Sequence, residues 1–281
     1  MELTQTELER VFADVVGRAL SEDLGSGDIT SEELFSVADR CEAVILLKEA
    51  GIVCGLPVVR AAFRKLDETI EIERLVGEGE VVTEAPREIV RLAGRTRALL
   101  GAERVALNLL GRLSGIATLT RRFVEAVEGT GVAILDTRKT TPGLRVLEKY
   151  AVRTGGGVNH RYGLFDAVLV KDNHLRLAGG VEEAVRRLRA TVNLPLEVEV
   201  DTFEEVERAL ELGVERILLD NMSPAEAARA VKLVAARAQL EVSGGLTLEN
   251  VRAYAETGVN AISIGALTHS ARSLDVSLEV L

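Results

Sequence analysis

Short apolar runs, separated by amphipathic segments, recur through the C-terminal half of the chain. The runs "LEVEV", "RILLD", "LEVS" and "AISIG" begin at residues 196, 216, 240 and 261. Helical patterns such as "TFEEVERALELG" and "SPAEAARAVKLVAAR" lie between them. Strands that alternate with helices at this spacing are typical of parallel βαβ units. Together with the earlier runs "VAILD" and "AVLV", the pattern predicts at least six such units.

This part of the chain fits an α/β barrel better than an open doubly wound sheet. The dinucleotide-binding pattern G-x-G-x-x-G, which is common in open sheets, does not follow an early strand. Thr202, Ser223 and Thr247 stand where the helices between the strands need N-caps. The pattern therefore predicts a barrel domain over residues 111–272, in an α/β protein with parallel strands.

The first hundred residues follow a different pattern, which predicts a separate α+β domain over residues 1–110. The expected elements are a helix at 4–20, a polar loop at 21–30, two strands around Ala50 and Gly51, a helix at 58–66, a hairpin at 69–82 and a long helical region at 86–128. The tail at 273–281 alternates between apolar and polar residues again. We expect it to return and pair with the N-terminal sheet.

Composition narrows the class of protein. The chain has a formal net charge of −10, with 47% hydrophobic and 28% charged residues, which is ordinary for a globular protein. An acidic surface argues against nucleic-acid binding. The absence of an 18-residue apolar run argues against a membrane span. The N-terminus lacks the basic and apolar regions of a signal peptide, and Cys41 and Cys54 fit reduced thiols. We expect a cytoplasmic protein.

One segment departs from the acidic average. Residues 136–176 hold eight Lys or Arg residues against four Asp or Glu residues, counted from the sequence. Within this segment, Arg138 and Lys139 directly follow the apolar run "VAILD". Adjacent cations at the end of a buried strand suggest an anionic ligand. The glycine-rich stretch "RTGGGVNHRYG" reads as a mobile loop that carries His160 and Arg161 into the same site.

Functional groups of a barrel gather where the strands end. The early strand ends bring cations, the middle ones carboxylates and the late ones small residues. In chain order the strand-end residues are Asp136, Arg138, Lys139, Lys171, Asp172, His174, Glu199, Asp201, Asp220, Asn221, Ser243, Gly244, Gly245 and Gly265. Small residues after the last two strands are typical of the barrel phosphate site, in which backbone N–H groups hold the phosphate.

Plainer interpretations of the same residues stay open at this point. "SGGLT" could be a tight turn, and Glu199 and Asp220 could form ordinary ion pairs inside the barrel. The cations could form a structural network with Asp136, Asp166 and Asp172. Those three acids cannot neutralise all the nearby cations, and an unpaired buried cation costs several kcal/mol. An anionic ligand therefore explains the segment better.

Several longer motifs resemble the quinolinate phosphoribosyltransferase family. They include "EDLGSGDIT", "DTRKTTPGLR", "GGGVNHRYGL", "KDNH", "LLDNMSP" and "EVSGGLTLENV", and the resemblance runs from about residue 18 to the C-terminus. It implies an N-terminal open-faced sandwich domain and an incomplete α/β barrel, in a homodimer with a shared active site, with higher assembly left open. It also implies the conversion of quinolinate and phosphoribosyl pyrophosphate to nicotinate mononucleotide, pyrophosphate and CO2 in NAD biosynthesis, with Mg²⁺ and without an organic cofactor.

The resemblance also implies residue roles. Arg104 would reach quinolinate across the dimer interface, and Arg138, His160, Arg161 and Lys171 would line the quinolinate pocket. Lys139 would lie between this pocket and the phosphates of the donor. Glu199 and Asp220 would face the ribose and the metal. Phosphate-binding roles fall to Lys139, Ser243, Gly244, Gly245 and Gly265.

Three rival functions would use the same residues differently. A paralogous phosphoribosyltransferase with another substrate would keep the phosphate residues and lose part of the Arg/His pocket. A Schiff-base aldolase on a similar barrel would use Lys139 or Lys171 as nucleophile. A non-catalytic ligand-binding barrel would leave Glu199 and Asp220 without a task.

Overall fold

The protein, described here by a computed structural model, divides into two compact units. The structure describes residues 3–281, so the first two residues of the predicted N-terminal domain lie outside it. The barrel unit consists of Arg121–Lys139 and Gly157–Ala266. The sandwich unit consists of the chain up to Thr120, together with Thr140–Gly156 and Leu267–Leu281. Each unit thus draws on several segments, and the continuous bounds 1–110 and 111–272 stay a prediction.

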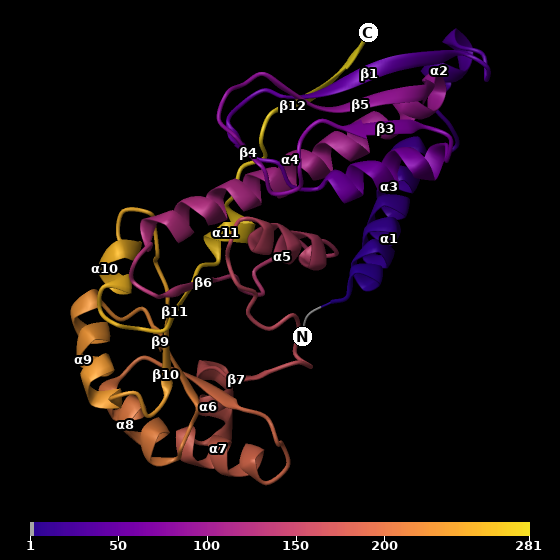
Figure 1. The fold of residues 1–281 in the computed structure, drawn as a ribbon. Coiled ribbons are helices and arrows are strands. Elements are labelled where there is room, and N and C mark those ends of the chain that lie inside the picture. The colour runs from indigo at the N-terminus through magenta and orange to yellow at the C-terminus, as the bar shows by residue number, and fades with distance from the viewer. Residues whose placement is uncertain (1–2) are drawn as a thin grey trace. The chain divides into compact units, whose positions relative to one another are not determined.

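The sandwich unit is built on a four-stranded antiparallel sheet with strand order β12-β1-β5-β3 (Figure 1). Its strands are β1 (Arg40–Leu47), β3 (Glu71–Arg74), β5 (Arg87–Arg95) and β12 (Val276–Val280). A separate pair joins β2 (Gly51–Ile52) and β4 (Val81–Val82). The tail strand β12 thus pairs with β1, where its alternation predicts a strand.

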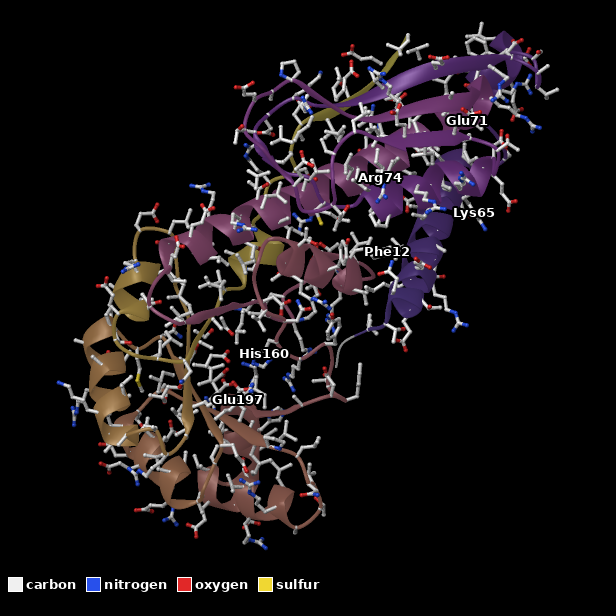
Figure 2. The ribbon with its side chains drawn as sticks, viewed as in Figure 1. Phe12, Lys65, Glu71, Arg74, His160 and Glu197 are labelled. Atoms are coloured by element: carbon white, nitrogen blue, oxygen red, sulfur yellow. The ribbon has the colours of Figure 1, made fainter. Side chains whose placement is uncertain are left out.

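The helices of the sandwich unit are α1 (Gln5–Leu24), α2 (Ile29–Leu34), α3 (Leu56–Leu66), α5 (Arg145–Thr154) and most of α4 (Thr96–Ala126). A capping box between Thr4 and Glu7 begins α1. Phe12 of α1, labelled in Figure 2, is 2% exposed and meets the Tyr150 ring edge to face, with centroids 5.3 Å apart. An apolar face of α1 therefore lies in the core of this unit.

Three expectations for this region are wrong in part. Within the expected polar loop at 21–30, α1 continues to Leu24 and α2 begins at Ile29. The expected hairpin at 69–82 is absent, because β3 pairs with β5 and β4 pairs with β2. The expected helical region at 86–128 begins with strand β5, whose two neighbours β1 and β3 complete its hydrogen bonds. Partners distant in sequence decide these strands, and local periodicity does not reveal them.

The barrel unit contains a six-stranded parallel sheet with strand order β6-β11-β10-β9-β8-β7. Its strands are β6 (Ala133–Leu135), β7 (Val168–Val170), β8 (Leu196–Val200), β9 (Arg216–Asp220), β10 (Gln239–Ser243) and β11 (Ala261–Ser263). Within the described residues β6 and β7 remain edge strands, so the sheet is an incomplete barrel. The predicted βα units are confirmed.

Helices follow the strands and cover the outer face of this sheet (Figure 1). They are α6 (Asp172–Ala178), α7 (Val181–Arg189), α8 (Phe203–Glu211), α9 (Pro224–Val234) and α10 (Val251–Ala255). The short helix α11 (Ala266–His269) follows β11 and belongs mostly to the sandwich unit. Thr202 and Ser223 cap α8 and α9 as predicted. The helix α10 begins at Val251, after a turn in which the Thr247 carbonyl accepts from the Val251 N–H at 3.0 Å and the Asn250 side chain accepts from the Thr247 N–H at 2.8 Å, so Thr247 lies one turn before the helix start. None of the helices in the described residues combines the length and apolarity needed to span a membrane.

Candidate active site

A pocket of about 390 Å³ lies at the carboxyl ends of the barrel strands. Its lining consists mostly of alternate strand residues and the two cationic loops: Thr137, Arg138, Lys139, His160, Arg161, Leu169, Lys171, Glu199, Leu218, Asp220, Glu241, Ser243 and Ser263. Alternate residues of a strand face the same side, so Glu197 shares a face with Glu199, and Glu241 with Ser243. The interior therefore has an upper layer at the strand ends and a floor one step below.

The loop after β6 brings two cations to the pocket. Thr137 Oγ1 accepts a hydrogen bond of 3.0 Å from the backbone N–H of Lys139 and fixes the turn. The Nε atom of Arg138 is buried and has no hydrogen-bond partner among the described residues. A buried guanidinium N–H without an acceptor is costly. The pocket thus offers a donor that an anionic ligand would satisfy.

Arg161 adds a second guanidinium to the same pocket. Burial, together with the neighbouring charge of Arg138, lowers the pKa of Arg161, although Glu197, Asp166 and Glu199 oppose this effect. Its Nη1 donates a 3.3 Å hydrogen bond to the carbonyl of Ala167. The two guanidinium groups repel each other, and an anion bound between them would offset this repulsion.

The loop that carries Arg161 is tied to β6. The carboxylate of Asp136 accepts hydrogen bonds from the backbone N–H of His160 at 2.9 Å and from Asn159 Nδ2 at 2.6 Å. Val158 forms a parallel bridge with Leu135. The expectation that this loop delivers His160 and Arg161 to the site is confirmed by their place in the pocket lining. The hydrogen bonds show a tethered loop in place of the expected mobile one.

The three acids once considered as partners for the cations are used otherwise. Burial raises the pKa of Asp166, but hydrogen bonds from the backbone N–H groups of Tyr162 and Gly163 outweigh burial and lower it. Asp136 is fully buried and holds the loop. Asp172 is exposed at the start of α6. The hydrogen bonds that Asp136 and Asp166 accept therefore serve the structure of the loop and leave room for an anionic ligand.

Lys171 and Glu199 form an ion pair at the ends of β7 and β8. The plainer interpretation of an ion pair inside the barrel is thus correct for Glu199. Asp220, at the end of β9, accepts a 2.7 Å hydrogen bond from Asn221 Nδ2. Burial, and then the charge of Glu199, raises the pKa of Asp220, while Lys171 and Lys139 oppose this. The two carboxylates therefore lie on neighbouring strands, and the charges of Glu199, Lys171 and Lys139 all act on Asp220.

The small residues lie together at the ends of β10 and β11. Ser243 is in register with Ser263, and Gly265 follows two residues later. Gly244 has φ +99°, and a Cβ atom there would lie 2.1 Å from Asn221 Oδ1. Gly245 also has positive φ, +59°. The backbone can take this shape only with glycine at position 244, which leaves the N–H groups of this turn uncovered by side chains.

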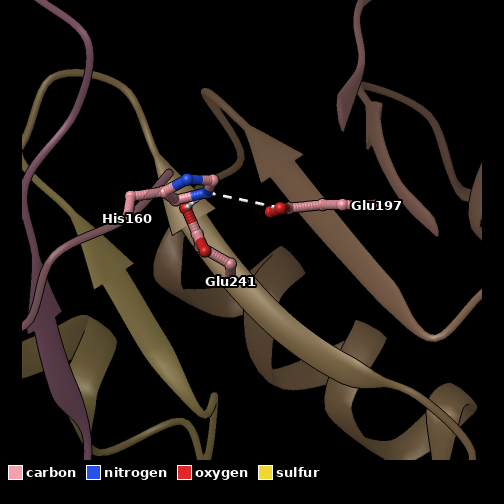
Figure 3. A group of neighbouring side chains, drawn as sticks. All are labelled: His160, Glu197 and Glu241. Atoms are coloured by element: carbon pink, nitrogen blue, oxygen red, sulfur yellow. Dashed lines mark ion pairs between the residues drawn. The ribbon is translucent and has the colours of Figure 1, made fainter. Parts of the chain in front are cut away.

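Below the upper layer lies a histidine–carboxylate cluster of His160, Glu197 and Glu241 (Figure 3). His160 Nε2 is 3.3 Å from Glu197 Oε2 and 3.6 Å from Glu241 Oε1. Figure 2 shows His160 and Glu197 directed toward one another inside the barrel unit. Burial, followed by the charge of Glu197, raises the pKa of Glu241 to about 7, against the opposing effects of His160, Ser263 and Arg216. This is the most strongly buried group of charges in the pocket.

Our sequence reasoning missed Glu197 and Glu241. A signal was present, because both glutamates stand inside short apolar strands, where a charged residue is rare unless it has a partner. Asp136 was considered only as a partner for cations, and its role in holding the loop depends on Val158 to His160 folding back onto β6. The sequence pattern of β6 or of the glycine-rich loop, taken alone, does not show that the loop folds back onto β6.

Arg104 belongs to the sandwich unit. It lies on α4, and its side chain is 62% exposed beside Glu103. It is not among the residues that line the barrel pocket. The other residues to which the resemblance gives a role line the pocket, except Gly244, Gly245 and Gly265, and the strand-end residue Asp201 is not part of the lining either.

Comparison with known proteins matches both parts of the chain. Residues 28–114 match the model of the quinolinate phosphoribosyl transferase N-terminal domain, and residues 116–279 match the C-terminal domain of the same family. A solved structure named nicotinate-nucleotide pyrophosphorylase from Ehrlichia chaffeensis superposes with a TM-score of 0.93 at 39% identity, covering 100% of each chain.

Curated relatives are similar over nearly their whole length. The probable nicotinate-nucleotide pyrophosphorylase (carboxylating) of Bacillus subtilis is 44% identical, over 92% of this chain and 90% of its own. The nicotinate-nucleotide pyrophosphorylase (carboxylating) of Mycobacterium leprae is also 44% identical, over 95% of this chain and 96% of its own. With two matched domains, full-length relatives and a pocket that gathers the motif residues, this chain belongs to the quinolinate phosphoribosyltransferase family.

Proposed function

We propose that this protein transfers the phosphoribosyl group of phosphoribosyl pyrophosphate to quinolinate and releases pyrophosphate and CO2. The product is nicotinate mononucleotide, an intermediate of NAD biosynthesis. The observation that carries the proposal is the like-charged pair of Arg138 and Arg161 in the barrel pocket, where Arg138 Nε is buried without a partner. The names of the relatives support the same reaction.

A substrate with two adjacent carboxylates fits these cations. A guanidinium can hold a carboxylate with two parallel hydrogen bonds, so Arg138 and Arg161 can each take one carboxylate of quinolinate. Lys171 is engaged with Glu199 in the ligand-free protein. When a dianion enters, the Lys171 ammonium gains a second acceptor beside Glu199.

The carboxylates of the upper layer suit the transfer step. The bond from ribose C1 to pyrophosphate breaks as the bond from the quinolinate ring nitrogen to C1 forms, and positive charge develops on the ribose. Glu199 and Asp220 would stabilise this charge, which is larger in the transition state than in the ground state. The ring then carries a cationic nitrogen. Its carbon–carboxylate bond breaks, the ring takes up the electron pair, a proton replaces CO2, and no organic cofactor is needed.

The turn after β10 suits the 5′-phosphate of the donor. Gly244 must be glycine to fit beside Asn221, and its neighbours Ser243 and Gly245 extend the same turn. Uncovered backbone N–H groups bind phosphate oxygens well. Gly265, beyond the adjacent strand β11, would complete the site, with Lys139 at the pyrophosphate.

Mg²⁺ fits the donor atoms of the upper layer. Glu199 and Asp220 supply carboxylate oxygens on neighbouring strands, and Mg²⁺ in phosphate-transfer sites is commonly held by one or two carboxylates plus substrate phosphates. When bound, the ion neutralises the charge of the leaving pyrophosphate. The residues of this chain hold the substrates around it.

The family resemblance gives Arg104 a quinolinate-binding role, and a homodimer would supply it. We propose that Arg104 of one subunit completes the barrel pocket of the other. Its exposed position on α4, with only a weak ion pair to Glu103 at 3.5 Å, leaves the guanidinium available to a partner.

The direct test measures pyrophosphate and CO2 released per quinolinate consumed, with purified protein, phosphoribosyl pyrophosphate and Mg²⁺. The proposal predicts one of each per turnover. Pyrophosphate release without CO2, or with another acid in place of quinolinate, would instead favour a paralogous phosphoribosyltransferase. A Schiff-base aldolase would need Lys139 or Lys171 as nucleophile, and Lys171 is already paired with Glu199. Borohydride trapping with a carbonyl substrate tests both lysines.

A further inference from the structure

The functions assigned so far give Glu197 and Glu241 no task. Their side chains are 4% and 5% exposed, and that of His160 is 9% exposed. Burying two carboxylates beside each other is unfavourable unless they serve a partner. Ser263 donates a hydrogen bond to Glu241 Oε1, while Glu197 Oε1 is buried without a hydrogen bond. The cluster is therefore maintained against a cost in stability.

The hydrogen bonds of the His160 ring define where its proton lies. The backbone N–H of Arg161 donates to His160 Nδ1 at 2.7 Å, so the lone pair of Nδ1 is in use. In a neutral imidazole the proton then sits on Nε2, the atom that faces Glu197 and Glu241. The two carboxylates thus favour one tautomer and one orientation of the ring.

The same three side chains could also be considered as a metal site, since their ligand atoms lie within 4.8 Å of one another. A metal-binding histidine uses the lone pair of one nitrogen and donates the N–H of the other to an acceptor. In this cluster the nitrogen remote from the carboxylates accepts a hydrogen bond, which is the reverse arrangement. The ring is therefore set up for a proton between His160 and the carboxylates.

We propose that Glu197 and Glu241 are positioning residues of the quinolinate pocket, which lock the His160 ring and, through its Nδ1, the backbone at Arg161. The inference rests on the function proposed above. The backbone is held on both sides of His160, because Asp136 accepts from the His160 N–H and the His160 ring accepts from the Arg161 N–H. The Arg161 guanidinium, which lines the pocket, thus extends from a fixed point.

Two kinds of substitution separate the volume of each buried glutamate from its role as a hydrogen-bond acceptor. Glu197→Leu and Glu241→Leu keep the buried volume and remove the acceptor, whereas Glu197→Gln and Glu241→Gln keep an oxygen acceptor. Glu211, exposed on α8, supplies the matched control Glu211→Gln. Thermal melts show whether each Leu variant is folded before its kinetics are compared with those of the original protein.

The spectroscopic test uses the fact that the chain has three histidines. Ring ¹⁵N signals of the ligand-free protein are assigned by comparison with His174→Asn and His269→Asn. We expect His160 as a single tautomer with its proton on Nε2. In the double variant Glu197→Leu/Glu241→Leu, the His160 ring should show mixed tautomers or exchange-broadened signals. A His160 proton on Nδ1 in the original protein, or an unchanged tautomer in the double variant, would overturn the proposal.

The kinetic test separates positioning from general damage. Misplacing a substrate-binding group by about 1 Å can cost about 100-fold, so the Leu variants should raise the KM for quinolinate by about 10- to 100-fold. The KM for phosphoribosyl pyrophosphate should stay unchanged, and the Gln variants should recover most of the loss. An unchanged quinolinate KM in the Leu variants, or a tightly held divalent metal lost on Glu197→Leu, contradicts positioning. If the original protein does not use quinolinate, the proposed function fails, while the tautomer measurement still decides the role of the cluster.

Discussion

Lys171 and Glu199, at the ends of the neighbouring parallel strands β7 and β8, neutralise each other in the ligand-free pocket. The resemblance gives them opposite tasks, since Lys171 would bind an anion and Glu199 would stabilise a cation. Their ion pair holds both side chains in place before either substrate arrives. Bound quinolinate must therefore compete with Glu199 for the Lys171 ammonium. Removing the charge of Lys171 should affect substrate binding, whereas removing the charge of Glu199 should affect the rate of transfer.

We predict that Glu199→Gln lowers kcat by about 100- to 1,000-fold, the usual loss for one positioned electrostatic group. The Kd for quinolinate should stay the same or fall, because the Lys171 ammonium is released toward the substrate. Single-turnover rates and calorimetric titration measure the two quantities, with Glu211→Gln as control. A variant with near-normal kcat would show that Glu199 does not stabilise the transition state.

Stability should depend on pH through Glu241. Burial raises the pKa of Glu241 in the folded protein to about 7, above its ordinary value of 4.5. The unfolded state therefore loses this proton first, so the buried group lowers stability progressively as pH rises from 4.5 to 7 and does so fully above 7. Glu241→Gln should be more stable than the original protein by up to about 3 kcal/mol at pH 8 and by much less at pH 4.5. Denaturant unfolding at both pH values tests this, and a gain that does not grow with pH contradicts the raised pKa.

Gly244→Ala should disable the phosphate end of the site. The added Cβ would lie 2.1 Å from Asn221 Oδ1, and the residue must also keep φ +99°. We expect weaker binding of phosphoribosyl pyrophosphate with little change in quinolinate binding. Gly179→Ala is the matched control, since Gly179 has φ +94° with open space around it and lies at the end of α6. Equal effects of the two substitutions would indicate backbone strain alone.

A shared active site predicts complementation between inactive chains. Arg104→Ala and Lys139→Ala should each abolish most activity. When the two variants are mixed, each hybrid dimer has one pocket with both original residues, so part of the activity should return. Subunit exchange is followed separately by native mass spectrometry of differently tagged chains. Full exchange without recovered activity would place Arg104 outside the partner's pocket.

The preference for quinolinate over nicotinate tests how many cations of the pocket contact the substrate. Nicotinate lacks the 2-carboxylate and would leave at least one buried cation of the pocket without a partner, at a cost of about 2–5 kcal/mol. This corresponds to a kcat/KM about 30- to 5,000-fold lower than with quinolinate. Competition assays with the two acids measure the ratio. Comparable use of both acids would mean that the pocket recognises a single carboxylate.

The site residues that could be predicted from the sequence are those whose position depends only on where each strand ends along the chain. Arg138, Lys171, Glu199, Asp220 and Ser243 each follow an apolar run, and parallel strands bring such positions to one edge. Glu197 and Glu241 escaped notice because their meaning depends on His160, which reaches them from a loop. The segment of β5 has a helical pattern in the sequence, and it forms a strand because it pairs with β1 and β3. Local sequence patterns do not show which distant segments will pair.

The tether at Asp136 bears on attempts to move this pocket to another protein. One carboxylate joins the segment of Arg138 to the segment of Arg161, so the spacing of the two guanidinium groups is set while the chain folds. A receptor that is ordered in advance loses less entropy on binding than one that is assembled by its ligand. A designer who grafts only the two arginines onto a new barrel would obtain the charges without their spacing. The graft would need Asp136, Asn159 and His160 as well, as the smallest portable unit for holding a dicarboxylate.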